Sequence, residues 1–111
     1  SRKGQGWQKS KRYEGTKNTD KDSYIYYIPE ESADNIYLVC DITEYDTTAV
    51  GDKGIEVYVN DKLIGNIDSK GTTKLKIGYV SGDELLTVKF HADNAEYTLY
   101  SISLDKGQAE T

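Results

Sequence analysis

The chain has 111 residues, a length that supplies one hydrophobic core but not two, and it therefore predicts a single domain. Only 36% of the residues are hydrophobic and ten are tyrosines, a composition that a small two-layer β protein tolerates. The formal net charge of −5 argues against nucleic acid or an anionic membrane surface as the partner of the domain.

The sequence contains no segment that resembles a targeting signal or a membrane span. No run approaches the roughly 18 apolar residues of a transmembrane helix, so we expect no direct membrane insertion by this segment. The chain also contains no Met, which predicts that it is an excised segment of a longer protein. Missing targeting signals then say nothing about where the parent protein resides.

Residues 1–22 form a polar N-terminal segment in which Lys and Arg outnumber the acidic residues. Such charge asymmetry can mark an arm that faces nucleic acid or a membrane, but we favour a linker that leads into the first strand. Trp7 is the exception in this segment. It either docks on the edge of the domain, the alternative that we favour, or stays exposed for stacking against sugars.

Two strands are predicted in the first half of the chain. The run at 23–28 is crowded with β-branched and aromatic residues, and Pro29 ends that strand or caps an edge. The next strand covers 35–42, where Ile36, Leu38, Cys40 and Ile42 share one face. Cys40 is the only cysteine and is in phase with aliphatic neighbours, so we interpret it as a buried core residue.

The segment 41–54 is expected to be the longest loop, and it is acidic. Four carboxylates offer oxygen ligands there, namely Asp41, Glu44, Asp46 and Asp52. Their spacing does not match that of an EF-hand, although backbone carbonyls can complete a calcium site. A solvated acidic loop is the interpretation that we favour, and calcium stays open as the alternative.

The stretch 54–91 carries the clearest alternation of apolar and polar residues. Val57 and Val59 alternate with Tyr58, while Val88 and Phe90 belong to a similar run near its end. The residues at 60–61 tolerate positive φ and predict a hairpin turn. We expect consecutive strands here to form an antiparallel meander with one buried and one solvated face.

The last strand runs from 96 to about 104, and its apolar phase slips between Leu99 and Tyr100, which predicts a β-bulge or a residue that faces a rim. Residues 107–111 are expected to form a frayed tail. The whole pattern predicts an all-β, antiparallel, jelly-roll-like β-sandwich of about seven to eight strands over residues 23–106.

No catalytic residue is predicted. His91 is the only histidine and lies on the polar face of its strand, and no nucleophile elbow or phosphate-binding loop occurs. One His and one Cys do not make a zinc site without carboxylates. We therefore expect no enzymatic activity and no cofactor, calcium excepted as the open alternative.

Exposed aromatic side chains are the candidates for ligand binding, because sugar rings stack on them. The candidates are Trp7, Tyr27, Tyr37, Tyr45, Tyr58 and Tyr79. The alternative is a cross-strand ladder of tyrosines that stabilises the sheet and binds nothing.

The run 55–65, IEVYVNDKLIG, resembles a hairpin in the extracellular part of the YfhO family of multi-pass bacterial membrane proteins. The continuation through 75–78, 80–84 and 86–88, and the closing 97–105, are similar to the same family, so that the resemblance covers about residues 23–106. Asp61 departs from the family pattern, which has Gly in this turn.

The resemblance implies a location and a role. It implies a non-catalytic, extracytoplasmic sandwich of a bacterial, glycosyltransferase-like membrane protein, on the extracellular face of the cell membrane. No catalytic residue carries over from the family. The expected partners are cell-envelope carbohydrate or neighbouring domains of the parent protein, and no nucleic acid. The alternative function is a structural or protein-interaction sandwich, a spacer or adhesion domain of a cell-surface protein.

Overall fold

The computed structural model describes the backbone of residues 11–18 together with residues 21–46, 53–93 and 97–107. Every regular element within these ranges is a β-strand. The strands are β1 (Lys11–Asn18), β2 (Asp22–Tyr27), β3 (Ala33–Tyr45), β4 (Ile55–Val59), β5 (Lys62–Ile67), β6 (Gly71–Val80), β7 (Leu86–His91) and β8 (Tyr97–Lys106). Among the described residues, no helix is long and apolar enough to span a membrane.

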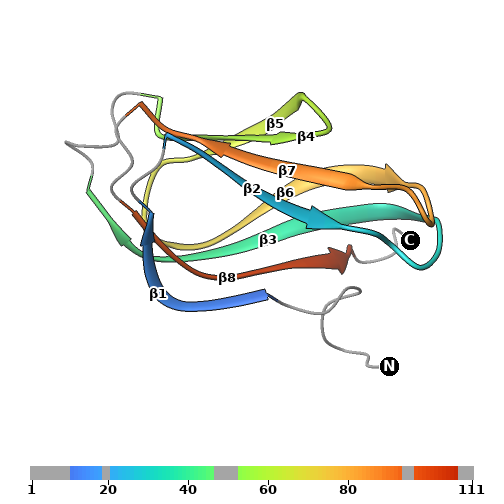
Figure 1. Ribbon diagram of the computed structural model, residues 1–111, viewed down its shortest axis with the longest axis horizontal. Helices are drawn as coiled ribbons and strands as arrows, with labels where there is room; N and C mark the ends of the chain where they lie inside the picture. Colours follow the sequence, from blue (N-terminus) through green and yellow to red (C-terminus); the bar gives the residue numbers. More distant parts are fainter. Residues whose placement is uncertain (1–10, 19–20, 47–52, 94–96, 108–111) are drawn as a thin grey trace.

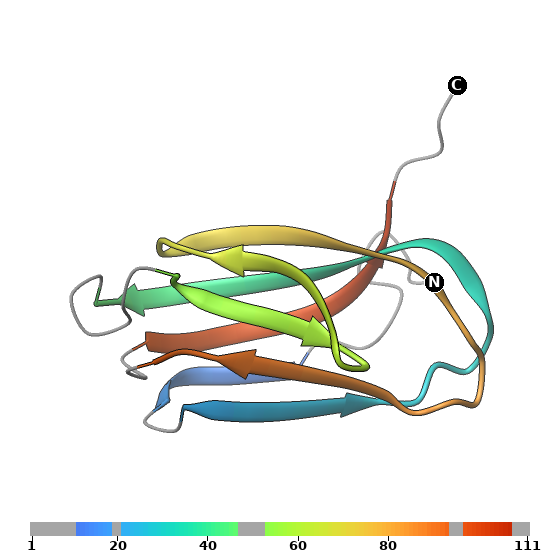
Figure 2. The same cartoon turned by 90° about the horizontal axis from the view of Figure 1, so that it is seen from above.

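The strands form two antiparallel sheets that lie face to face (Figure 1). One sheet has the order β1-β8-β3-β6 and the other has the order β2-β7-β4-β5. Viewed from above, the β2-β7-β4-β5 sheet lies in front of the other layer (Figure 2). This strand order is that of a jelly roll, in which the chain passes repeatedly from one sheet to the other. The predicted all-β, jelly-roll-like sandwich is therefore confirmed.

The core lies between the sheets and follows from the alternation of side chains along each strand. Ile36, Leu38, Cys40 and Ile42 of β3 are all buried, as are the alternate residues of β7, and both runs join one hydrophobic cluster. Each sheet thus buries one face against the other, which is what stabilises a two-layer fold. Burial also raises the pKa of the Cys40 thiol to about 12, so this thiol stays protonated, as expected of a core cysteine.

The predicted hairpin is present, and Asn60 and Asp61 adopt φ values of 49° and 70°. Positive φ at both central residues is the signature of a type I′ turn, so Asp61 takes the left-handed conformation without being glycine.

The predicted meander, in contrast, is wrong. β6 lies in the sheet opposite to that of β4 and β5, where it pairs with β3. β7 returns to the sheet of β4 and β5 and pairs with β2 and β4. Residues 68–70 join β5 to β6, and three extended residues span about 10 Å, the spacing of two stacked sheets. Alternation reports which face of a strand is buried, but it does not report which strand is its neighbour.

The linker predicted for residues 1–22 is also wrong over Lys11–Asn18, which form strand β1 at the edge of a sheet. β1 pairs with β8 and extends the sandwich toward the N-terminus beyond the predicted start at Ser23. Its sequence, KRYEGTKN, has no apolar alternation. An edge strand is held by backbone hydrogen bonds on one side, and charged residues there are typical, so the hydrophobic pattern misses it.

The predicted bulge in the last strand is confirmed. Ser101 pairs with Asp41, whereas Leu99 pairs with Ile42, so Tyr100 is the additional residue on β8. The bulge restores the phase that returns Ile102 to the core. Beyond β8, the amide of Gly107 donates to the carbonyl of Asn35 at 2.8 Å, and the rest of the predicted tail lies outside the described residues.

Candidate functional site

The outer face of the β2-β7-β4-β5 sheet carries a cross-strand row of large side chains. Tyr24 of β2 lies opposite Lys89 of β7, Lys89 lies opposite Tyr58 of β4, and Tyr58 lies opposite Leu63 of β5. Tyr26 lies two residues along β2 from Tyr24 on the same face. We call these five residues the aromatic face.

The local sequence of β2 explains why its tyrosines point outward. Ile25 and Tyr27 are buried, and side chains alternate along a strand, so Tyr24 and Tyr26 must face solvent. Their rings are parallel to within 6°, with centroids 6.3 Å apart, and each residue is 51% exposed. This is an offset-parallel aromatic pair that leaves ring surface open to a ligand.

The third tyrosine of the aromatic face carries a cation. The Nζ atom of Lys89 lies 4.5 Å from the centroid of the Tyr58 ring, a cation–π contact that covers part of that ring. Tyr58 is half-buried. The part of the Tyr58 ring available to a ligand is therefore smaller than that of Tyr24 or Tyr26.

A polar row borders the aromatic face. Asp22, His91 and Glu56 lie side by side on β2, β7 and β4. Nδ1 of His91 lies 2.6 Å from an Asp22 carboxylate oxygen, and its Nε2 lies 3.5 Å from Asp93. At the other border, the side-chain oxygen of Asn60 accepts a hydrogen bond from the Thr87 amide at 2.9 Å. Hydrogen-bonding groups thus flank the aromatic surface on two sides.

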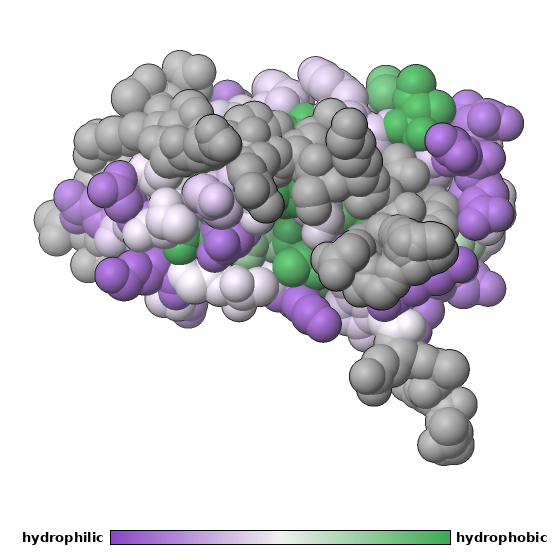
Figure 3. Space-filling model, turned by 90° about the horizontal axis from the view of Figure 1, so that it is seen from below, coloured by the Kyte–Doolittle hydropathy of each residue, from purple (hydrophilic) through white to green (hydrophobic). Residues whose placement is uncertain are grey.

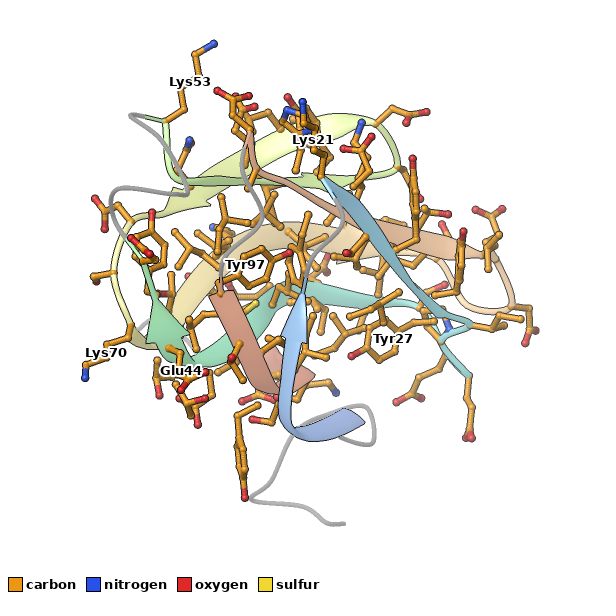
Figure 4. All side chains as sticks on the ribbon, turned by 60° about the vertical axis from the view of Figure 1, so that its left-hand side comes forward. Lys21, Tyr27, Glu44, Lys53, Lys70 and Tyr97 are labelled. Atoms are coloured by element: carbon orange, nitrogen blue, oxygen red, sulfur yellow. The ribbon has the colours of Figure 1, made fainter. Side chains whose placement is uncertain are left out.

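Tyr27 was predicted as a ligand-binding residue, and the structure contradicts this. It is only 5% exposed, and its hydroxyl donates to the carbonyl oxygen of Ile102 in the other sheet at 3.4 Å. Figure 4 shows its side chain directed toward the middle of the molecule, as is that of Tyr97. Tyr27 is in phase with Ile25, and this phase places it in the core.

The remaining predicted tyrosines do not gather in one place. Tyr37 lies on the outer face of β3, and Tyr79 is 61% exposed on β6, so both belong to the other sheet. Tyr45 is half-buried, and its hydroxyl donates to the carbonyl of Ile67 at 3.3 Å. Burial, with a smaller contribution from Asp68, raises the pKa of Tyr45. Of the predicted set, Tyr58 alone belongs to the aromatic face, and Trp7 lies outside the described residues.

Tyr24 and Tyr26, the two most accessible rings of the aromatic face, were not among the candidates predicted from the sequence. The signal was present in the run YIYY at 24–27, because a buried Ile25 places its two neighbours on the solvated face. Figure 3 shows the opposite side of the molecule, that of β1, where the described surface is mostly hydrophilic, with hydrophobic groups near the middle and at one end.

The predicted calcium ligands do not converge in the described part of the chain. Asp41 is a residue of β3, which continues to Tyr45, so the expected loop is shorter than predicted. Glu44 accepts a hydrogen bond from the Thr98 hydroxyl at 2.6 Å, Asp46 is exposed, and Asp52 lies outside the described residues. Within the described ranges, no group of three or more His, Cys, Asp or Glu side chains is placed to hold a metal ion.

Comparison of the chain with protein-family models, with curated proteins and with solved structures found no match.

Proposed function

We propose that this domain is a non-catalytic carbohydrate-binding module and that the aromatic face is its binding surface. The observation that carries the proposal is the parallel pair of Tyr24 and Tyr26, each half exposed, on the outer face of a rigid sheet. Exposed apolar side chains that lie together, in contrast to single ones, are typical of binding surfaces on soluble proteins.

The chemistry of this surface fits a sugar ring. A pyranose presents a face of C–H groups, which packs on an aromatic ring, and a rim of hydroxyl groups, which need hydrogen-bond partners. The tyrosine pair supplies the apolar contact. Asp22 and His91 on one side, and Asn60 on the other, supply donors and acceptors for the hydroxyl groups.

The test is a glycan array followed by calorimetric titration of the glycans that bind. We expect the double variant Tyr24→Ala/Tyr26→Ala to bind the glycan about tenfold or more weakly, since the loss of each ring removes a stacking contact of about 1 kcal/mol. Tyr79→Ala is the matched control, because it removes a tyrosine of similar exposure from the other sheet. An array without binding, or equal losses in the two proteins, contradicts the proposal.

The cellular setting is a further part of the proposal, supported by the resemblance of residues 23–106 to the extracellular region of the YfhO family. In that setting the module is an extracytoplasmic accessory of a bacterial, glycosyltransferase-like membrane protein and binds cell-envelope carbohydrate. The test is the complete gene product. Hydrophobic spans flanking this segment, and protease accessibility of the segment on intact cells, are the expected results, and an intracellular location contradicts this part.

A protein-interaction role is the second candidate, favoured by the end of the sandwich at which β2 meets β7. Ile28 and Leu85 are exposed there, next to the last β2–β7 pair, Tyr27 and Leu86. Together with Tyr26 they place apolar surface beside an edge strand, which suits a neighbouring domain of the parent protein. Hydrogen exchange tests this candidate by comparing the isolated domain with the longer gene product. Protection of residues 26–28 only in the longer protein supports it, and unchanged exchange contradicts it.

A further inference from the structure

We propose that the aromatic face selects an acidic saccharide, one that carries a carboxylate or a phosphate group, and that the Lys89 ammonium group contacts this anion. The inference rests on the proposed function and names its class of ligand. It does not follow from the tyrosine pair, which suits neutral and acidic sugars equally.

The position of Lys89 is the first argument. It lies between Tyr24 and Tyr58 in one cross-strand row, and directly opposed side chains on antiparallel strands have Cβ atoms about 4.5–5.5 Å apart. A sugar stacked on Tyr24 and Tyr26 therefore has its nearest edge next to the lysine. The ammonium group lies over the Tyr58 ring, so an acidic substituent contacts it where the saccharide extends from β2 across β7 toward β4.

The state of the ammonium group is the second argument. A lysine side chain normally moves freely in water, but the contact with the Tyr58 ring at 4.5 Å restricts Lys89 to one region of the surface. Among the described residues, Lys89 makes no ion pair with a carboxylate, so its charge is not compensated there. A cation that is held in place and not neutralised is suited to an anionic ligand.

The surrounding charges limit how strong this preference can be. Asp22 and Glu56 lie in the neighbouring row, although Asp22 contacts His91 at 2.6 Å. The net charge of −5 also repels an acidic polymer at long range. The attraction must therefore come from a short-range contact, and it must weaken as salt is added.

The experiment compares ligands that differ only in charge. Oligogalacturonate is titrated against its methyl ester, and glucose 6-phosphate is titrated against glucose, so that the two arms separate carboxylate from phosphate. At low salt we expect at least one acidic ligand to bind about fivefold more tightly than its neutral counterpart, as for a partly exposed ion pair. We expect Lys89→Met to abolish this preference, so that the acidic ligand binds no more tightly than its neutral counterpart.

Lys76→Met is the matched control, because it removes the same charge from an exposed position on β6 in the other sheet. The inference is supported when the acid preference is lost in Lys89→Met and retained in Lys76→Met. Equal binding of acidic and neutral ligands overturns the inference but leaves the proposed function intact, as does an acid preference that survives Lys89→Met. Absence of binding by every saccharide on the array overturns both.

Discussion

Adjacent residues of β2 offer the sharpest test of how the chain is oriented in the sandwich. Tyr27 is 5% exposed and packs in the core, whereas Tyr26 is 51% exposed on the aromatic face. Replacing a buried aromatic residue by Ala removes its transfer free energy and leaves a cavity, at a loss of about 3–5 kcal/mol. We therefore expect Tyr27→Ala to remove a large part of a total stability that is typically about 5–15 kcal/mol.

Two further variants complete the test. Tyr26→Ala should lower the free energy of unfolding by less than about 1 kcal/mol, because it loses only the contact with Tyr24 and half-exposed surface. Tyr27→Phe should lower it by about 0.5–1 kcal/mol, since the hydroxyl makes a long hydrogen bond of 3.4 Å to Ile102.

The assay is urea unfolding of the three variants and of the unsubstituted domain, monitored by fluorescence and circular dichroism. A thermal scan should agree, with Tyr27→Ala lowering the midpoint by about 10 °C or more. If Tyr26→Ala is as destabilising as Tyr27→Ala, the assignment of the two faces of β2 is wrong, and the aromatic face with it.

Three other predictions each concern a single feature of the fold. Burial raises the pKa of Cys40 from 9.0 to about 12, so the unfolded thiol ionises first and the free energy of unfolding should fall as the pH rises from about 9 to 12. Cys40→Ala should lack that component of the pH dependence, and the native thiol should resist a thiol reagent until the protein unfolds. Asp61→Gly should leave stability unchanged or raise it by up to about 1 kcal/mol, since φ is 70° there, and a large loss in urea unfolding would contradict the type I′ turn. Calcium, compared with a chelator, should leave the thermal midpoint unchanged, and a clear rise would restore the calcium hypothesis.

The alternation of side chains made the core predictable. Ile36, Leu38 and Cys40 were assigned to one face of a strand from their spacing alone, and all three are buried. The bulge at Tyr100 was visible for the same reason, because a slip of one residue in the apolar phase requires one more residue on that strand than on its partner. These features depend only on residues that are close together in the sequence.

The features that the sequence did not reveal depend on residues far apart in the chain. The pairing of β6 with β3 joins strands that are separated by two others, and a period-2 pattern contains no information about that choice. β1 was missed because its partner β8 lies near the other end of the chain, and because the sequence of β1 has no apolar alternation. Tyr27 was grouped with tyrosines on the face opposite the aliphatic residues, although its spacing from Ile25 places it in the core.

The most direct test of carbohydrate binding by the aromatic face is an NMR titration of the isotope-labelled domain with a saccharide that binds on the array. We expect the shift changes to cluster at Tyr24, Tyr26, Tyr58 and Lys89, on the outer face of the β2-β7-β4-β5 sheet. Shift changes centred on Tyr37 and Tyr79 of the other sheet, or no changes at saturating ligand, would contradict it.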